Sequence, residues 1–204
     1  MLTVADCTLI QREQLPDSPP SGWLAAADFA TACAALPLVS VDVYVTRQVG
    51  KARELLLGLR NNRPAKGWWF TPGGRVRKGE TVPKALERVI REELGIPSLP
   101  LMPTRLLGVW DHTYPDSAFN PQTSTHYVNL AYALELPALC IDQLPTIGVS
   151  GASSVAQHSQ WRWHPLPEVA CATDIHAFVK PAADLLVKRL HSEVNSMQTV
   201  GGKP

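Results

Sequence analysis

The sequence predicts a single domain of the mixed α/β (α+β) class. Segments of β-branched and alternating apolar residues are interspersed with helical stretches, and no internal repeat is evident. A chain of 204 residues with 45% hydrophobic and 18% charged residues can bury one core. Residues 14–22 (QLPDSPPSG) carry the turn and breaker residues of a linker. We therefore expect a flexible N-terminal extension at 1–22, one domain at 23–191 and a C-terminal tail at 192–204.

The first half of the domain predicts one helix and three strands. An alanine-rich segment is typical of a helix, and β-branched alternation indicates a central strand with Asp42 in its middle. A basic polar loop that begins at Arg60 precedes the third strand. The predicted elements are a helix at Leu24–Ala35 and strands at Leu38–Thr46, Glu54–Leu59 and Trp68–Thr71.

A glycine-rich loop leads from these strands into a short helix. Gly73 and Gly74 permit backbone angles that are closed to other residues, and Arg75 places positive charge beside them. Such a loop suits an anionic ligand. The helix is predicted over Val82–Leu94, with Thr81 as its N-cap, a proline in its first turn and a glycine stop.

This helix has one apolar stripe, and the stripe contains an acid. At about 100° per residue, Glu93 falls inside the stripe. A buried carboxylate without a partner is costly, so Glu93 should meet a cation. The alternative is a helix whose last turn is simply exposed. The apolar members of the stripe are Val82, Ala85, Leu86, Val89 and Ile90.

The second half predicts a strand pair, a long loop, a final strand and a closing helix. Strands at Thr104–His112 and His126–Leu136 flank a polar loop and are expected to pair. Residues 137–156 are loop-like and could close over a ligand. A final strand is predicted to begin at Trp161–Trp163, and an amphipathic helix is predicted over Ile175–Leu190.

Composition argues against nucleic acid or a membrane as the partner. The formal net charge is only +1, and no stretch of about 18 apolar residues occurs. The first ten residues lack the basic start and the long apolar run of a signal peptide. Four widely spaced cysteines fit reduced thiols better than disulfides or zinc ligands. We therefore expect a cytoplasmic protein.

The loop and the helix together resemble the Nudix box. This box is a signature of hydrolases that act on nucleoside diphosphates linked to another moiety. One position departs from it, because the acid that usually follows the arginine is Val89 here. One carboxylate that normally helps to bind metal for attack on phosphorus is therefore missing. The matching residues are Gly74, Glu80, Arg88, Ile90, Glu92, Glu93, Gly95 and Ile96.

Motifs outside the box resemble the GDP-mannose mannosyl hydrolases, a subfamily whose box is incomplete. The resemblance extends from about Trp23 to about Lys180, and the motifs occur in the right order. It implies an αβα sandwich with a mixed central β-sheet, and a homodimer. The motifs are LPLVSVD at Leu36–Asp42, LLGLRNNRPAKGWWFTPGGRV at Leu56–Val76, GVWDH at Gly108–His112, THYV at Thr125–Val128, and Gln157-His158 before Trp161-Arg162-Trp163.

The resemblance also implies a Mg²⁺ site. Its protein ligands would be the carboxylate of Glu93, the carbonyl of Gly73 and the side chain of Gln157, and these oxygen donors suit this hard cation. Without the resemblance, Glu93 could form a surface ion pair with Arg91 or Lys84. Gln157 alone would indicate nothing.

Four residues are implied in catalysis. His158 would be the general base, although by itself it could be a hydrogen-bonded loop histidine. Arg60 and Arg75 would bind the diphosphate and neutralise it as it departs, with solvated arginines as the alternative. Tyr127 would donate a hydrogen bond to the same leaving group, or could be a strand residue with a structural partner.

Two further residues are implied as sugar contacts. Asp42 and His112 would contact the hexose, although both could have purely structural partners in their strands. Within the box, Glu80 is expected to hold the loop against the helix. Arg88 is expected to orient Glu92 through an i, i+4 pair.

These expectations lead to a Mg²⁺-dependent hydrolase of GDP-mannose, with GDP-glucose as a second candidate substrate. Water would attack the anomeric carbon with inversion and release GDP and free hexose. Because Glu92 is retained, an ordinary Nudix pyrophosphohydrolase that attacks phosphorus is the alternative. A third hypothesis is a regulatory Nudix domain that binds a nucleotide sugar without catalysis.

Overall fold

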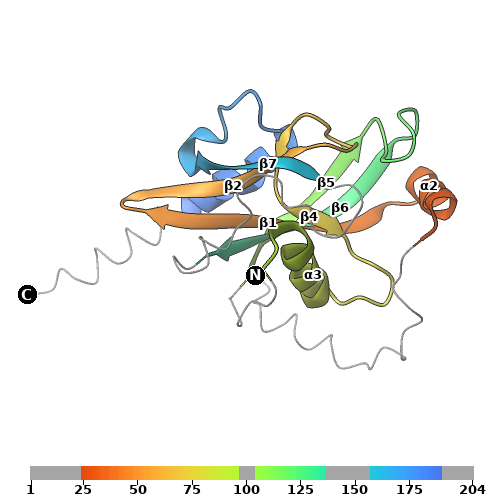
Figure 1. Cartoon of the computed structure of the whole chain (residues 1–204), viewed down its shortest axis with the longest axis horizontal. Helices are drawn as coiled ribbons and strands as arrows, with labels where there is room; N and C mark the ends of the chain where they lie inside the picture. Colours follow the sequence, from red (N-terminus) through yellow and green to blue (C-terminus); the bar gives the residue numbers. More distant parts are fainter. Residues whose placement is uncertain (1–23, 97–103, 137–156, 190–204) are drawn as a thin grey trace, which may run out of the picture.

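The computed structural model describes residues 24–96, 104–136 and 157–189. The predicted N-terminal extension, the loop at 137–156 and the predicted tail lie outside the described residues. Figure 1 shows the arrangement. The elements are α2 (Ala26–Ala35), β1 (Leu38–Val49), β2 (Ala52–Arg60), β3 (Trp69–Phe70), β4 (Gly73–Arg75), α3 (Val82–Leu94), β5 (Arg105–Tyr114), β6 (Thr125–Glu135) and β7 (His158–Pro165), with 3₁₀ turns at Leu166–Glu168 and Ala177–Val179. Residues 180–189 are helical.

Strand β1 is the centre of a mixed sheet with the order β3-β2-β1-β6-β5. It runs parallel to β6, and β6 pairs antiparallel with β5 as predicted. On its other edge, β1 changes partner: Thr46–Val49 pair with β2, whereas Ser40–Asp42 pair with β4. Strand β2 pairs with β7 from Glu54 to Arg60, and it pairs with β3 at Gly58 and Leu59, beyond its contact with β1. The sheet therefore splits beside the first half of β1.

Helices cover both faces of this sheet, as the αβα sandwich requires. The odd-numbered residues Val41, Val43 and Val45 pack in one cluster with the apolar face of α3. Tyr44 packs in a second cluster with the helical residues 180–189. Because successive strand residues face opposite sides, Asp42 shares the side of Tyr44 and lies across the sheet from α3.

Gly73 and Gly74 are extended strand residues, which corrects the predicted loop with special backbone angles. Neither glycine has a positive φ, and both lie in β4. They are needed for space, because a Cβ on Gly73 would collide with Oδ1 of Asp42. A Cβ on Gly74 would lie 3.2 Å from Cγ2 of Val89. Glycine therefore lets β4 approach both β1 and α3.

The last two predicted boundaries were also wrong. Strand β7 begins at His158 and not at Trp161, because His158 pairs with Arg60 beyond a bulge in β2. The closing helix begins near residue 180 rather than at Ile175, which forms a parallel bridge with Trp69 instead. The predicted bounds of α3 are confirmed, including the Thr81 cap and a left-handed Gly95 at its end. Among the described residues, no helix combines the length and apolar character needed to cross a membrane.

Replacing Ile90 by alanine should lower the free energy of unfolding by about 2–5 kcal/mol, because a core cavity replaces a side chain that is only 1% exposed. Urea denaturation measures the loss. The control is Glu87→Ala on the exposed face of the same helix, which should change stability by no more than about 0.5 kcal/mol. Equal losses in the two variants would contradict the packing of α3 described above.

Candidate active site

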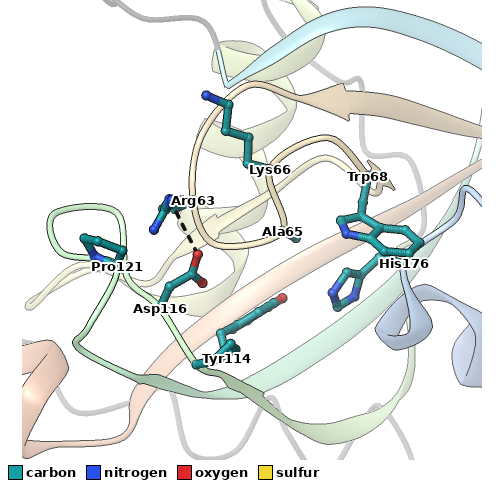
Figure 2. A pocket seen from close by; sticks show the side chains of 9 residues that line it. Arg63, Ala65, Lys66, Trp68, Tyr114, Asp116, Pro121 and His176 are labelled. Carbon is teal, nitrogen blue, oxygen red and sulfur yellow. Dashed lines mark ion pairs between the residues drawn. The ribbon is translucent and has the colours of Figure 1, made fainter.

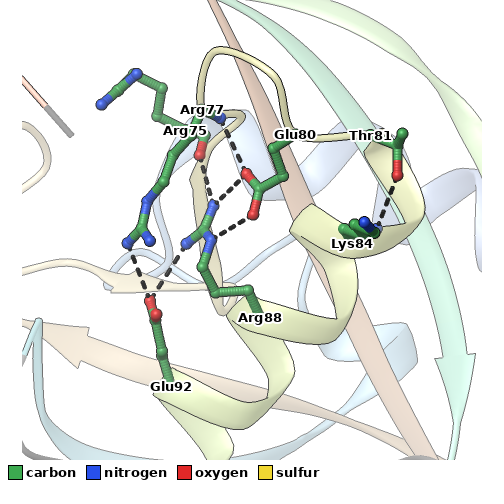
Figure 3. A network of polar contacts seen from close by, with 7 residues as sticks. All are labelled: Arg75, Arg77, Glu80, Thr81, Lys84, Arg88 and Glu92. Atoms are coloured by element: carbon green, nitrogen blue, oxygen red, sulfur yellow. Dashed lines mark hydrogen bonds and ion pairs between the residues drawn. The ribbon is translucent and has the colours of Figure 1, made fainter. Parts of the chain in front are cut away.

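The box residues form a polar network between β4 and α3 (Figure 3). Arg88 donates two hydrogen bonds to the Glu80 carboxylate, at 2.7 and 2.9 Å, and one to the carbonyl of Arg75 at 2.8 Å. The predicted i, i+4 pair is present, with Nη1 of Arg88 3.2 Å from Oε2 of Glu92. Arg77 contacts the same Glu92 oxygen at 3.5 Å. Glu80 therefore holds the loop on the helix as expected, and Glu92 is engaged by two arginines.

Glu93 meets the imidazole of His158 and not a lysine or arginine. The Nδ1 atom of His158 lies 2.9 Å from Oε2 of Glu93. The two side chains are 1% and 12% exposed, respectively. Gly58 in β2 leaves room for the ring, since a Cβ there would lie 2.5 Å from Cδ2 of His158. Trp161 covers it, with ring centroids 4.6 Å apart. His158 is therefore a packed strand residue rather than a residue of an open loop.

The surroundings keep His158 neutral and orient it. Burial lowers the pKa of His158, and the Glu93 carboxylate only partly opposes this effect. A carboxylate accepts hydrogen bonds, so Nδ1 carries the proton and Nε2 keeps its lone pair. That Nε2 atom is buried and has no hydrogen-bond partner within the described part of the chain. A group in this state can accept a proton from water once water reaches it.

Arg60, the last residue of β2, provides the positive charge at the centre of the site. Its guanidinium donates to the carbonyl of Pro64 at 2.9 Å and to the Gln157 side chain at 3.4 Å, and it lies over the ring of Phe70. Its charge influences the pKa of groups on both faces of the sheet. These groups are Asp42, Tyr114, Tyr127, His158 and His176.

On the opposite face, Asp42 and His112 form a buried acid and base pair. They are 5% and 3% exposed, and Nδ1 of His112 lies 4.0 Å from Oδ2 of Asp42. Burial raises the pKa of Asp42 to about 7 and lowers the pKa of His112 to about 4. His112 also stacks on Phe178, with centroids 4.5 Å apart. Both residues thus have the structural partners that the sequence left open, although no described residue forms a hydrogen bond with Oδ2 of Asp42.

Arg75 and Tyr127 lie on the side of the site that faces α2. The guanidinium of Arg75 sits 4.9 Å from the ring centroid of Phe29, a residue of α2. Burial raises the pKa of Tyr127 to about 12, while the charges of Arg60 and Arg75 act in the opposite direction. The phenol therefore stays protonated and can donate a hydrogen bond at neutral pH.

The structure thus joins the predicted residues in pairs rather than in one cluster. Glu93 contacts His158, Gln157 contacts Arg60, and Gly73 is the cross-strand neighbour of Asp42. Two residues beside Arg60, Tyr114 and His176, were missed. No sequence signal connects them, because they come from distant segments and meet only in the fold, where their rings lie 5.7 Å apart.

The family model for the NUDIX domain matches residues 36–194, which include the whole network just described. The chain belongs to the Nudix family. Solved Nudix structures agree with the fold of this Nudix domain. The NUDIX domain of Shewanella oneidensis NrtR, complexed with ADP ribose, has a TM-score of 0.54 at 17% identity, with 93% of this chain and 99% of that chain covered. A mutT/nudix family protein from Listeria innocua has a TM-score of 0.55 at 19% identity, with 78% and 97% covered.

Two curated relatives match about half of this Nudix chain. The low-salt glycan biosynthesis protein Agl8 of Haloferax volcanii is 42% identical over 101 residues, which are 50% of this chain and 60% of that protein. The ADP-ribose pyrophosphatase of Methanocaldococcus jannaschii is 36% identical over 100 residues, or 49% and 52% of the two chains. The match thus spans less than two thirds of either relative.

The depressed pKa of His112 predicts a loss of stability in acid. The unfolded chain takes up a proton on this residue below about pH 6.5, whereas the folded chain resists until about pH 4, so the stabilisation is present at neutral pH and is lost as pH falls. Between pH 7 and pH 5, the unfolding free energy of His112→Gln should fall less than that of the wild type, by on the order of 2 kcal/mol. Urea denaturation at both pH values measures this difference, and identical slopes would contradict it.

Proposed function

We propose that this protein is a Mg²⁺-dependent Nudix hydrolase that splits GDP-mannose, with GDP-glucose as a second candidate substrate, into GDP and free hexose. The observation that carries the proposal is the state of His158. A neutral imidazole oriented by a carboxylate, with an unpartnered Nε2, suits the general base that attack on carbon requires.

The position of Val89 supports attack on carbon rather than on phosphorus. Its side chain is 1% exposed and packs in the apolar cluster under α3. The box acid missing here is therefore replaced by a core residue. The second acid, Glu92, is held by Arg88 and Arg77. This leaves Glu93 and His158 as the pair that is available for chemistry.

The proposed reaction begins with removal of a proton from water by Nε2 of His158. The water attacks the anomeric carbon from the side opposite the diphosphate, and this displacement inverts the centre. Arg60 and Arg75 then bind the departing diphosphate through their guanidinium groups, and Tyr127 donates a hydrogen bond to it. Asp42 and His112 would contact the hexose, and a sugar hydroxyl would donate a hydrogen bond to Oδ2 of Asp42, which has no partner among the described residues.

The three proposed ligands offer the oxygen donors that suit Mg²⁺, and since the structure does not join them in one cluster, the ion would be shared with the substrate. The described residues contain no group of three or more His, Cys, Asp or Glu that could hold a metal by itself. Mg²⁺ usually takes one or two carboxylates together with substrate phosphates and water. Glu93, the carbonyl of Gly73 and the amide oxygen of Gln157 would hold it. When bound, the ion neutralises charge on the diphosphate and makes GDP a better leaving group.

A pyrophosphohydrolase that attacks phosphorus is the second candidate. The observation in its favour is the match to the M. jannaschii ADP-ribose pyrophosphatase, together with the retained Glu92. The match to Agl8, named for glycan biosynthesis, is compatible with a nucleotide-sugar substrate. A homodimer and a cytoplasmic location are further expectations, from the resemblance and from the reduced cysteines.

Reaction with GDP-mannose and Mg²⁺ in ¹⁸O-water should place the label in mannose and leave GDP unlabelled, because water attacks carbon. Mass spectrometry of the products locates the label, and NMR should show the β anomer as the first sugar formed from the α-linked donor. If the label appeared in a phosphate, water would have attacked phosphorus, and the protein would be assigned as a pyrophosphohydrolase. Nucleotide-sugar binding without any product would indicate a regulatory domain.

Glu93→Gln should reduce kcat by about 10²-fold or more, because the change weakens both the metal ligand and the hydrogen bond that orients His158. Steady-state kinetics across a Mg²⁺ titration measures the effect. Its matched control is Glu92→Gln, one residue earlier on the same helix, which should cost much less because Glu92 is paired with arginines. A larger effect at Glu92 would show that the metal ligand has been assigned to the wrong acid.

A further inference from the structure

A cavity of about 490 Å³ opens between the loop that joins β2 to β3 and the loop that joins β5 to β6. We call it the Trp68 pocket. Figure 2 shows Trp68 next to His176 on one side, and Arg63 facing Asp116 on the other. Arg63, Lys66 and Trp68 come from the first loop, Tyr114 and Asp116 from the end of β5 and the loop after it, and His176 from the turn before the last helix.

Residues that line the pocket contact residues of the candidate site, including Arg60, which is proposed to bind the diphosphate. Arg60 donates to the carbonyl of Pro64, in the middle of the first loop. The ring of Tyr114 lies 5.7 Å from that of His176 and 6.4 Å from that of His112. Arg60 therefore contacts the loop that lines the pocket, so a group linked to a diphosphate on Arg60 would lie beside that loop.

The lining suits a ligand with several hydroxyl groups and an apolar face. Trp68 is 40% exposed, so one large aromatic surface is available for stacking. Asp116 accepts hydrogen bonds, Arg63 and Lys66 donate them, and Tyr114 and His176 can do both. A hydroxyl is a donor and an acceptor at once, so this mixture fits a sugar ring better than a phosphate, which would meet the Asp116 carboxylate unfavourably.

The ion pair in the pocket is loose enough to be shared with a ligand. Nε of Arg63 lies 3.8 Å from Oδ2 of Asp116, with 45% and 22% of the two side chains exposed. At this distance the carboxylate keeps capacity to accept further hydrogen bonds. The position of Asp116 does not depend on this ion pair, because its backbone carbonyl accepts a hydrogen bond from the Thr125 hydroxyl at 2.9 Å.

We propose that the Trp68 pocket is the hexose subsite of this enzyme, in which Trp68 stacks on the sugar ring and Asp116 accepts hydrogen bonds from its hydroxyls. This inference rests on the proposed function and adds the residues that decide between hexoses. Mannose and glucose differ only in the orientation of one hydroxyl, so a single well-placed acceptor can distinguish them.

Asp116→Asn and Trp68→Ala should each lower kcat/KM for GDP-mannose by about 10-fold or more, and Asp116→Asn should also change the ratio of GDP-mannose to GDP-glucose activity. The inhibition constant of GDP, which lacks the sugar, should stay within about 2-fold of the wild-type value. Trp68→Phe keeps an aromatic face and should retain most of the activity. The control Asp111→Asn lies outside the pocket on β5, with its side chain 73% exposed, and should change none of these values. Circular dichroism verifies that each variant is folded.

A parallel rise in the GDP inhibition constant would overturn the proposal, because it would place the guanosine end in the pocket. Unchanged kinetics in both variants would overturn it as well. If the wild type does not hydrolyse GDP-mannose, the proposed function fails separately. Calorimetric titration of the uncleaved GDP-mannose then tests the pocket alone: Trp68→Ala must weaken GDP-mannose binding but not GDP binding. Absence of GDP-mannose binding to the wild type would overturn both.

Discussion

The buried ion pair between Arg88 and Glu80 holds helix α3 on strand β4, and the candidate site depends on that attachment. Arg88 is 9% exposed and also donates to the carbonyl of Arg75, so one side chain connects the loop, the strand and the helix. Removing one partner of such a pair typically costs about 3–5 kcal/mol, because the other charge stays buried and unpaired. With the helix anchored at its middle, its last turn presents Glu93 to His158 on strand β7.

The split in the sheet determines which residues can meet. Strand β1 pairs with β4 in its first half and with β2 in its second half, and Arg60 lies at the end of the strand that diverges. Arg60 therefore influences groups on both faces, whereas Asp42 and Glu93 face opposite sides of the sheet. Strand β4 can lie close to β1 and α3 because Gly73 and Gly74 have no side chains that would contact Asp42 and Val89. Gly73 and Gly74 act here through close packing rather than through unusual backbone angles.

Burial gives the site its electrostatic character. It lowers the pKa values of His112, His158 and His176 and raises that of Tyr127, so these groups are neutral around pH 7. Positive charge is then concentrated on the arginines beside them. Such an arrangement suits a substrate whose negative charge lies on a diphosphate and whose other end is uncharged.

The sequence by itself determined the elements whose signals are local. Helix α3, its Thr81 cap and Gly95 end, the Arg88–Glu92 pair and the antiparallel partners β5 and β6 were all predicted, because capping, helical spacing and alternation act over a few residues. The resemblance to the Nudix box also predicted the family and, through the family, the sandwich.

The tertiary structure alone decided how distant segments meet. The start of β7 at His158 depends on pairing with Arg60 across the sheet, and the late start of the last helix depends on the bridge from Ile175 to Trp69. Likewise, the partner of Glu93 and the meeting of Tyr114, Trp68 and His176 result from contacts between segments far apart in the chain. The sequence does not show how far apart such segments lie in space. Only packing of the folded chain could bring these side chains together.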